Sequence, residues 1–280
     1  MKREAFLVCA LLCFGCSSED AAGAGSVSFE TWGEDYIEQG IGSEQFEDGW
    51  SVHYDQFLIN LGQFRIASSA GETAATLPTS QLFDMTRPGP QPVAEVHDLE
   101  ARKWDRVSFA IAPADASTST TANTTEADLD MMRQGGYSVL VRGTATDGTT
   151  QKSFAWGFPC TTTYGECHAE LDGKETDGVI VTNGGNDTVQ VTIHGDHFFY
   201  DDLASPAAVL RFAPLAAADA DQDGEVTLAE LSAVKLFEVD VGTYGTGAAN
   251  IDDLGAYVSA LSSTIGHYRG EGECVVSVKK

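Results

Sequence analysis

The segment from Asp219 to Glu230 places oxygen-bearing groups at the spacing that one calcium ion requires. Counted from Asp219 as position 1, carboxylates stand at positions 1, 3, 5 and 12, with a backbone carbonyl at position 7 and a hydroxyl at position 9. Gly224 at position 6 permits the sharp turn that a side chain would resist. Converging carboxylates repel one another unless a cation lies between them. The expected calcium ligands are Asp219, Asp221, Asp223, Glu225, Thr227 and Glu230.

This segment resembles the calcium loop of the EF-hand family, with an apolar residue, Val226, at the position that pins such a loop to a neighbour. A single loop of this kind leaves its edge uncovered, so we expect a partner. Aligning Ile251 with Val226 puts Tyr244 and Gly255 where ligands would stand, and neither can chelate. We therefore expect a degenerate partner loop that pairs Ile251 with Val226, the alternative being an unrelated helical cap.

Histidines offer a second possible metal site, for copper or zinc, which neutral imidazole binds well. His194 and His197 point to opposite faces of an extended strand, but a bend at Gly195 would bring them closer. The alternative is that these histidines are ordinary surface or hydrogen-bonded core residues. The expected ligands are His53, His194 and His197, with His97 a weaker addition, whereas His168 and His267 are expected to be structural.

The catalytic motifs that a sequence can reveal are missing. The chain contains no Gly-x-Ser-x-Gly elbow, no phosphate-binding loop and no zinc-protease helix. We therefore expect a binding or scaffold protein and no enzyme. The calcium is expected to be mainly structural, because extracellular calcium modules bind weakly enough for steady occupancy where calcium is plentiful.

The N-terminus predicts export. Lys2 and Arg3 precede a short apolar run from Ala5 to Gly15, which suits a signal peptide and is too short to span a bilayer. The run ends in Leu12–Cys16, a pattern that resembles a bacterial lipobox with Cys16 as the lipidated residue. The alternative is an ordinary signal peptide and a soluble secreted protein.

The expected anchor is therefore lipid attached to Cys16, after a signal peptide of residues 1–15 and before a tether of residues 16–25. Ser17 and Ser18 favour the outer membrane. The chain has a formal net charge of −26, which excludes binding to nucleic acid or to an anionic membrane surface by charge. Calcium and an envelope protein are the partners we expect.

Three cysteines remain in the exported part. A disulfide between Cys160 and Cys167 would close a short Thr-rich turn, and a bond between Cys167 and Cys274 is the competing pairing. A metal site built from the thiolates of Cys160 and Cys167 is less favoured, because export favours oxidation.

Residues 26–203 predict a mainly β domain, an antiparallel β-sandwich, because apolar residues alternate along several segments with short turns between them. Asp147-Gly148 predicts a hairpin between Tyr137–Thr146 and Thr149–Phe158. A second hairpin is expected between Gly178–Thr182 and Asp187–Phe199. A short helix is expected at Glu126–Gln134, stopped by glycine.

Residues 204–265 are expected to form the helical EF-hand segment. The spacing predicts helices over Pro206–Ala218 and Leu228–Val239, on either side of the calcium loop. Residues 266–280 contain a final strand, Cys274–Val278, that returns to the sandwich. Together these patterns predict a calcium-binding envelope lipoprotein, with a periplasmic copper- or zinc-binding lipoprotein as the alternative.

Overall fold

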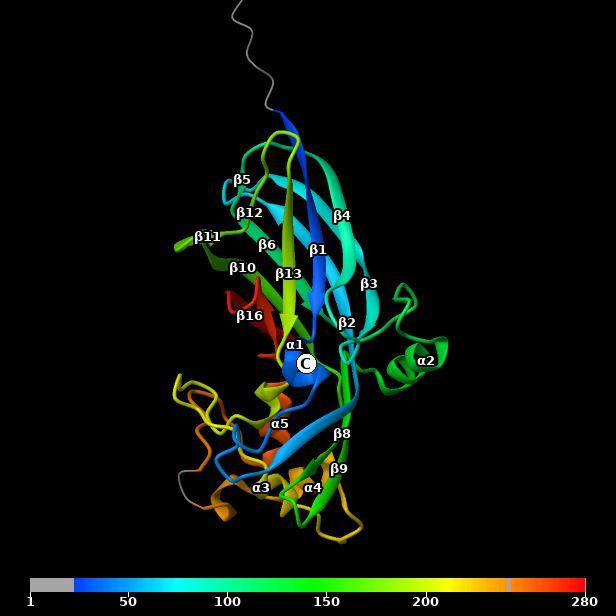
Figure 1. Cartoon of the computed structure of the whole chain (residues 1–280), viewed down its shortest axis with the longest axis vertical. Helices are drawn as coiled ribbons and strands as arrows, with labels where there is room; N and C mark the ends of the chain where they lie inside the picture. The colour runs from blue at the N-terminus through cyan, green and yellow to red at the C-terminus, as the bar shows by residue number, and fades with distance from the viewer. Residues whose placement is uncertain (1–22, 241–242, 280) are drawn as a thin grey trace, which may run out of the picture.

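The computed structural model describes residues 23–240 and 243–279. The expected signal peptide and Cys16 lie outside these residues. In Figure 1 a β-sandwich occupies the upper part of the molecule, helices α3, α4 and α5 gather at its lower end, and α2 projects to one side. The helices are α1 (Glu34–Glu38), α2 (Glu126–Gly135), α3 (Ala213–Ala216), α4 (Leu228–Ala233) and α5 (Leu254–Leu261), with 3₁₀ turns η1 (Asp196–Phe199) and η2 (Leu236–Glu238).

The fold is mainly β, as the sequence predicts. One sheet has four strands in the order β15 (Gly266–Tyr268), β13 (Asn186–Ile193), β1 (Ala24–Trp32) and β4 (Gln91–Glu100). A small third sheet joins β12 (Val179–Ile180) to β5 (Lys103–Trp104). The four-stranded sheet contains one parallel pair, β1 with β13.

The large sheet has ten strands and curls around the other side of the core (Figure 1). Its main path runs β11 (Lys174–Asp177), β10 (Thr161–Leu171), β6 (Arg106–Ile111), β2 (Ser51–Ala67), β8 (Val139–Thr146), β9 (Gln151–Phe158) and β14 (Glu225–Val226). Off this path, β3 (Thr73–Asp84) pairs with β2, β7 (Ser119–Thr120) pairs with β3, and β16 (Glu273–Lys279) pairs with β10.

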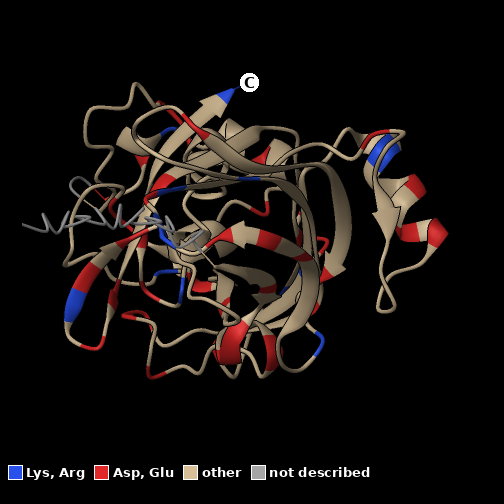
Figure 2. Ribbon diagram, turned by 90° about the horizontal axis from the view of Figure 1, so that it is seen from above, with Lys and Arg blue, Asp and Glu red and all other residues tan. Residues whose placement is uncertain are grey.

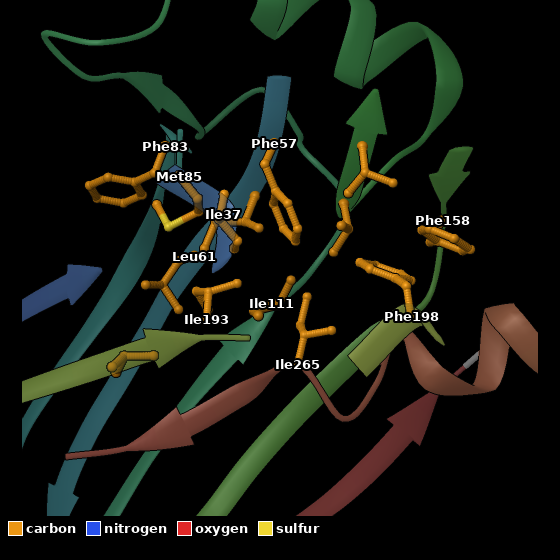
Figure 3. Close-up of a cluster of buried hydrophobic side chains, with 14 of the residues drawn as sticks. Ile37, Phe57, Leu61, Phe83, Met85, Ile111, Phe158, Ile193, Phe198 and Ile265 are labelled. Atoms are coloured by element: carbon orange, nitrogen blue, oxygen red, sulfur yellow. The ribbon is translucent and has the colours of Figure 1, made fainter. Parts of the chain in front are cut away.

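The core fills the space between the two main sheets. Phe29 of β1 meets Phe64 of β2 with ring centroids 4.5 Å apart, so aromatic packing joins the sheets directly. Further down, Ile193 of β13 lies among side chains of the large sheet such as Leu61 and Ile111, and all three are buried (Figure 3). This packing fixes the end of β13, where the candidate site begins.

Several local predictions are confirmed. The hairpin of β8 and β9 turns at Asp147 and Gly148, and Gly148 has a positive φ of 88°. Helix α2 begins with a capping box between Thr125 and Asp128 and ends at Gly136, whose backbone is left-handed. The C-terminal strand β16 returns to the sandwich.

The second hairpin prediction is wrong. β12 pairs with β5, and β13 pairs with β1 on one edge and β15 on the other. The buried alternation of β13 is satisfied by strands distant in sequence, and a Gly-rich turn between two strands does not reveal which partner each will choose.

The helical segment is also less regular than predicted. Of Pro206–Ala218, only Ala213–Ala216 is α-helical. The carboxylate of Asp201 accepts a hydrogen bond from the backbone of Val209, and the next residue, Leu210, forms β-bridges to Tyr200 and Phe46, so this stretch cannot continue the helix. Of Leu228–Val239, α4 ends at Ala233, beyond which Val234 is extended. The backbone of Val234 then accepts a hydrogen bond from Leu254, so α4 and α5 pack together.

The expected pairing of Ile251 with Val226 does not occur. Val226 pairs instead with Phe154 of β9, and its carbonyl accepts a hydrogen bond from the indole of Trp156. The loop edge is therefore covered by the sandwich and needs no second loop.

The disulfide joins Cys167 to Cys274, so the pairing of Cys160 with Cys167 is wrong. Strand pairing explains the choice, because β10 and β16 lie side by side and bring the two cysteines opposite each other. No helix within the described ranges is both long enough and apolar enough to cross a bilayer.

Candidate metal centres

Three histidines from two strands and one turn meet at the lower end of the four-stranded sheet. His194 follows the last residue of β13, His197 lies in η1, and His267 lies in β15 opposite Thr192. One ring nitrogen from each lies within 4.8 Å of the others. The ring centroids are separated by 4.3 Å between His194 and His267, 5.1 Å between His197 and His267, and 5.3 Å between His194 and His197.

The bend that brings His197 back to His194 begins at Gly195. A Cβ atom at Gly195 would lie 2.6 Å from the side chain of Ile37 and 2.9 Å from that of Tyr54, which are both buried. The Tyr54 hydroxyl also donates a hydrogen bond to the Gly195 carbonyl at 2.6 Å. Glycine is therefore required by close packing, and the core fixes the turn.

Two threonines set the tautomers of two of the rings. Thr264 Oγ1 donates to the Leu261 carbonyl and lies 2.9 Å from His197 Nδ1, so it accepts a hydrogen bond from that nitrogen. Thr192 Oγ1 donates to the Gly270 carbonyl and lies 3.3 Å from His194 Nε2, so it accepts there. These bonds leave Nε2 of His197 and Nδ1 of His194 as unprotonated nitrogens, each with a lone pair.

The environment keeps the rings of His197 and His267 neutral. Burial, with a smaller effect from the neighbouring imidazoles of His267 and His194, lowers the pKa of His197 to about 3. Burial also lowers the pKa of His267, with the imidazole of His194 adding to the effect. The Nδ1 atom of His267 is buried and has no hydrogen-bond partner. Neutral rings with free lone pairs are what a transition metal ion requires of histidine.

Carboxylates and a cavity flank the three rings. Glu34, His194 and Glu271 also have ligand atoms within 4.8 Å of one another, and Glu34 Oε2 lies 3.8 Å from His194 Nε2. Burial raises the pKa of Glu34, although the nearby His194 opposes this. A cavity of about 730 Å³ borders His197, His267 and Glu271, so the cluster can be reached from outside.

The acidic loop forms a second cluster. Carboxylate oxygens of Asp219, Asp221 and Glu230 lie within 4.8 Å of one another. Gly224 has a φ of 89°, the left-handed turn that position 6 requires. Pairing of β14 with β9 ties the loop to the large sheet through Glu225 and Val226.

Asp219 is the most deeply buried carboxylate of this cluster. Its side chain is fully buried, and Oδ1 has no hydrogen-bond partner. Oδ2 accepts hydrogen bonds from the ammonium of Lys152 and the backbone of Gly224. The Lys152 ammonium lowers the pKa of Asp219 most strongly, so this carboxylate is held ionised.

The side chains of two of the remaining expected ligands, Asp223 and Thr227, form hydrogen bonds with neighbouring residues of the loop. Asp223 Oδ1 accepts from the backbone of Glu225, and Thr227 caps α4 in a reciprocal arrangement with Glu230. Hydrogen bonds from Thr227 lower the pKa of Glu230. Of the six expected calcium ligands, the structure therefore gathers the side chains of Asp219, Asp221 and Glu230.

The histidines predicted from sequence divide into two groups. His194 and His197 come together, whereas His53 lies on β2 with 61% of its side chain exposed and its nearest charged neighbour is Asp55 at 4.0 Å. His97 is likewise exposed beside Glu95. His267, which the sequence interpretation treated as structural, is the third member of the cluster. The sequence offered no local signal for it, since only the pairing of β15 with β13 brings it there.

Comparison with known proteins adds little to this geometry. No protein-family model matches the chain, and no curated protein matches it. One solved structure, MbnP from Methylosinus trichosporium, aligns over 62% of this chain and 76% of that one, with 10% sequence identity and a TM-score of 0.32. At that level the likeness carries no argument about function, and the candidate sites rest on their own geometry.

Proposed function

We propose that this protein is a non-enzymatic metal-binding protein that holds one copper or zinc ion on His194, His197 and His267. The observation that supports this most is the convergence of three ring nitrogens within 4.8 Å. Independent support comes from the buried Nδ1 of His267, which has no partner, because buried polar atoms are nearly always hydrogen-bonded or bound to a ligand.

The donor set suits these metals. Three neutral imidazoles favour zinc or copper over calcium or magnesium, which prefer oxygen ligands. The hydroxyls of Thr264 and Thr192 would hold the rings in the orientation that binding needs. The adjoining cavity leaves room for a further ligand, and the carboxylates of Glu34 and Glu271 would offset the charge of the ion.

Metal analysis tests this proposal. The full chain, carrying Cys16→Ser to prevent lipid attachment and lacking any histidine tag, would be analysed for bound metals and titrated with zinc and copper by calorimetry. We expect one ion per chain, lost in His267→Gln. The matched control is His53→Gln, an exposed histidine outside the cluster, which should bind as the parent does. Undiminished binding by His267→Gln would contradict the proposed site.

The acidic loop supports a second candidate, a structural calcium ion bound through Asp219, Asp221 and Glu230. The buried, unpartnered Oδ1 of Asp219 favours it, because a carboxylate oxygen without a donor suits a cation. Asp223, Glu225 and Thr227 would complete the coordination as in the EF-hand family. Calcium titration of the parent and of Glu230→Gln tests this site, and unchanged binding by the variant would contradict it.

We also propose that the protein is exported and anchored by lipid at Cys16, on the outer membrane. The support is the N-terminal sequence, and the disulfide between Cys167 and Cys274 agrees with an oxidising compartment. Mass spectrometry of the protein from an exporting bacterial host would detect acyl chains on Cys16. Protein that remains unmodified and partitions into the soluble fraction would exclude the anchor and favour the soluble secreted form. An envelope protein is the partner that such a location implies.

A further inference from the structure

Strand β16 is an unprotected edge of the large sheet. Within the described part of the chain it pairs with β10 alone, so the backbone groups that point away from β10 are used by no other strand. Val275, Val276 and Val278 are 63%, 44% and 45% exposed. Because adjacent residues of a strand point to opposite faces, β16 is apolar and open to solvent on both faces.

Edge strands are normally protected from pairing with another chain. The usual devices are inward-pointing charges, proline, a bulge or a covering loop. From Val275 to Lys279, β16 pairs with β10 in an unbroken register, and the irregularity beyond this range places the extra residue in β10, between Gly165 and His168; β16 contains no proline. The middle of the strand, Val275 to Val278, carries no charge. Such a strand is a template to which a further strand can be added.

We propose that two copies of this chain associate by antiparallel pairing of β16 with β16, about a two-fold axis at Val276. In this register Val276 faces its own copy, Cys274 lies opposite Val278, and Glu273 lies opposite Lys279. Neither Glu273 nor Lys279 has an ion-pair partner among the residues that the structure describes. Two new charge pairs would therefore flank an apolar centre.

Charge also explains why the edge suits a second copy of an acidic protein. The chain as a whole carries a charge of −26, which opposes association. Strand β16 itself has no net charge, because it contains one acidic residue, Glu273, and one basic residue, Lys279. The blue tip of the C-terminal strand in Figure 2 marks its basic end. At about 0.1 M salt, charges more than about 10 Å apart are largely screened, so the local pairs persist while the general repulsion weakens. The dimer should therefore strengthen as salt rises from low to moderate concentration.

Sedimentation of the full chain with Cys16→Ser tests the proposal. We expect a monomer–dimer equilibrium that Val276→Lys shifts toward monomer, because the two-fold axis brings the two new charges together. The dissociation constant should rise about tenfold or more. Ile180→Lys is the matched control, because Ile180 is 45% exposed and lies in β12 of another sheet. A parent that stays monomeric as its concentration rises, or an equal effect of both variants, would overturn the proposal.

A charge exchange gives a readout that does not depend on the folding of the lysine variant. Glu273→Lys and Lys279→Glu should each weaken the dimer, because each places like charges opposite each other. The double variant restores both pairs and should recover the affinity of the parent. Losses that simply add in the double variant would refute this register.

Discussion

Thr264 Oγ1 accepts a hydrogen bond from Nδ1 of His197 at 2.9 Å while donating its own proton to the carbonyl of Leu261. The threonine lies just beyond the end of α5, and the histidine lies in η1, so the contact links the helical segment to the turn that carries His197. Its consequence is a fixed tautomer, in which Nε2 of His197 has a free lone pair.

The first prediction concerns this bond. Thr264→Val keeps the shape of the side chain but cannot accept a hydrogen bond, so His197 loses the group that orients it. We expect zinc or copper affinity to fall about 10- to 100-fold, as is typical for the hydrogen-bond partners of metal ligands. Thr264→Ser retains the hydroxyl and should bind nearly as the parent does. Calorimetric titration measures both, and equal affinities of the valine and serine variants would show that the hydroxyl does not act on the site.

The second prediction concerns pH. In metal-free protein the pKa of His197 lies at about 3, below the value of about 6.5 expected in the unfolded chain. Between these values the unfolded chain binds a proton that the folded chain does not, so stability is full above pH 6.5 and falls as the pH falls. The slope is at most about 1.4 kcal/mol per pH unit for this proton. His267 acts in the same direction, because its pKa is also lowered.

Urea unfolding in chelator between pH 7 and pH 5 measures this effect. His197→Gln removes one titrating group and should flatten the dependence of the unfolding free energy on pH. His53→Gln changes an exposed histidine and should leave the slope of the parent intact. Parallel profiles for the parent and His197→Gln would mean that the ring is not held neutral in the folded state.

The two candidate sites differ in how far the sequence could predict them. The ligands of the acidic loop lie within twelve consecutive positions, so local spacing and Gly224 suffice to propose the site. The histidine cluster depends on the pairing of β15 with β13, strands separated in sequence by the whole helical segment. Local patterns give alternation and turns, but they do not give the partner of a strand, and this explains why the sequence does not place His267 beside His194 and groups His53 with it instead.

The same limit explains the fold predictions that failed. Asp147-Gly148 defines its hairpin through local turn chemistry, and that prediction is confirmed. Val226 was expected to pair with Ile251 by analogy with paired calcium loops, yet the apolar edge is covered by Phe154 of the sandwich. A local motif indicates that an edge must be covered, but the tertiary fold decides which segment covers it.

The third prediction separates calcium binding from helix capping. Glu230 accepts hydrogen bonds from Thr227 at the start of α4, so Glu230→Ala would destabilise the protein even in chelator, by about 1 kcal/mol. Glu230→Gln keeps an oxygen acceptor for Thr227, although its NH2 group replaces the oxygen that accepts from the backbone of Ala220, and it weakens the attraction for the cation. We therefore expect the glutamine variant to be less destabilised in chelator than Glu230→Ala and to lose most of the stabilisation that calcium gives.

Thermal unfolding with and without calcium measures this difference. Calcium at about one hundred times its dissociation constant should stabilise the parent by about 2.7 kcal/mol. Asp221→Asn is a second probe of the same loop. This change leaves the cap of α4 intact, because the hydrogen bond that Asp221 accepts comes from the backbone of Asp223. Parent protein whose unfolding is the same with calcium and with chelator would show that the loop binds no calcium.

The fourth prediction concerns the disulfide between Cys167 and Cys274, which closes a loop with a sequence separation of 107 residues. The bond restricts the unfolded chain, and for a loop of about 100 residues the chain-entropy estimate is about 4.7 kcal/mol. Because Cys167 is buried and Cys274 packs against the core, Cys167→Ser with Cys274→Ser should lower the unfolding free energy by about 2–5 kcal/mol. Cys160→Ser is the control, since Cys160 is not disulfide-bonded and its thiol forms a hydrogen bond with the hydroxyl of Ser262, which serine can also form. Denaturant unfolding of the three proteins decides the matter, and a double variant as stable as Cys160→Ser would show that the bond contributes nothing to the fold.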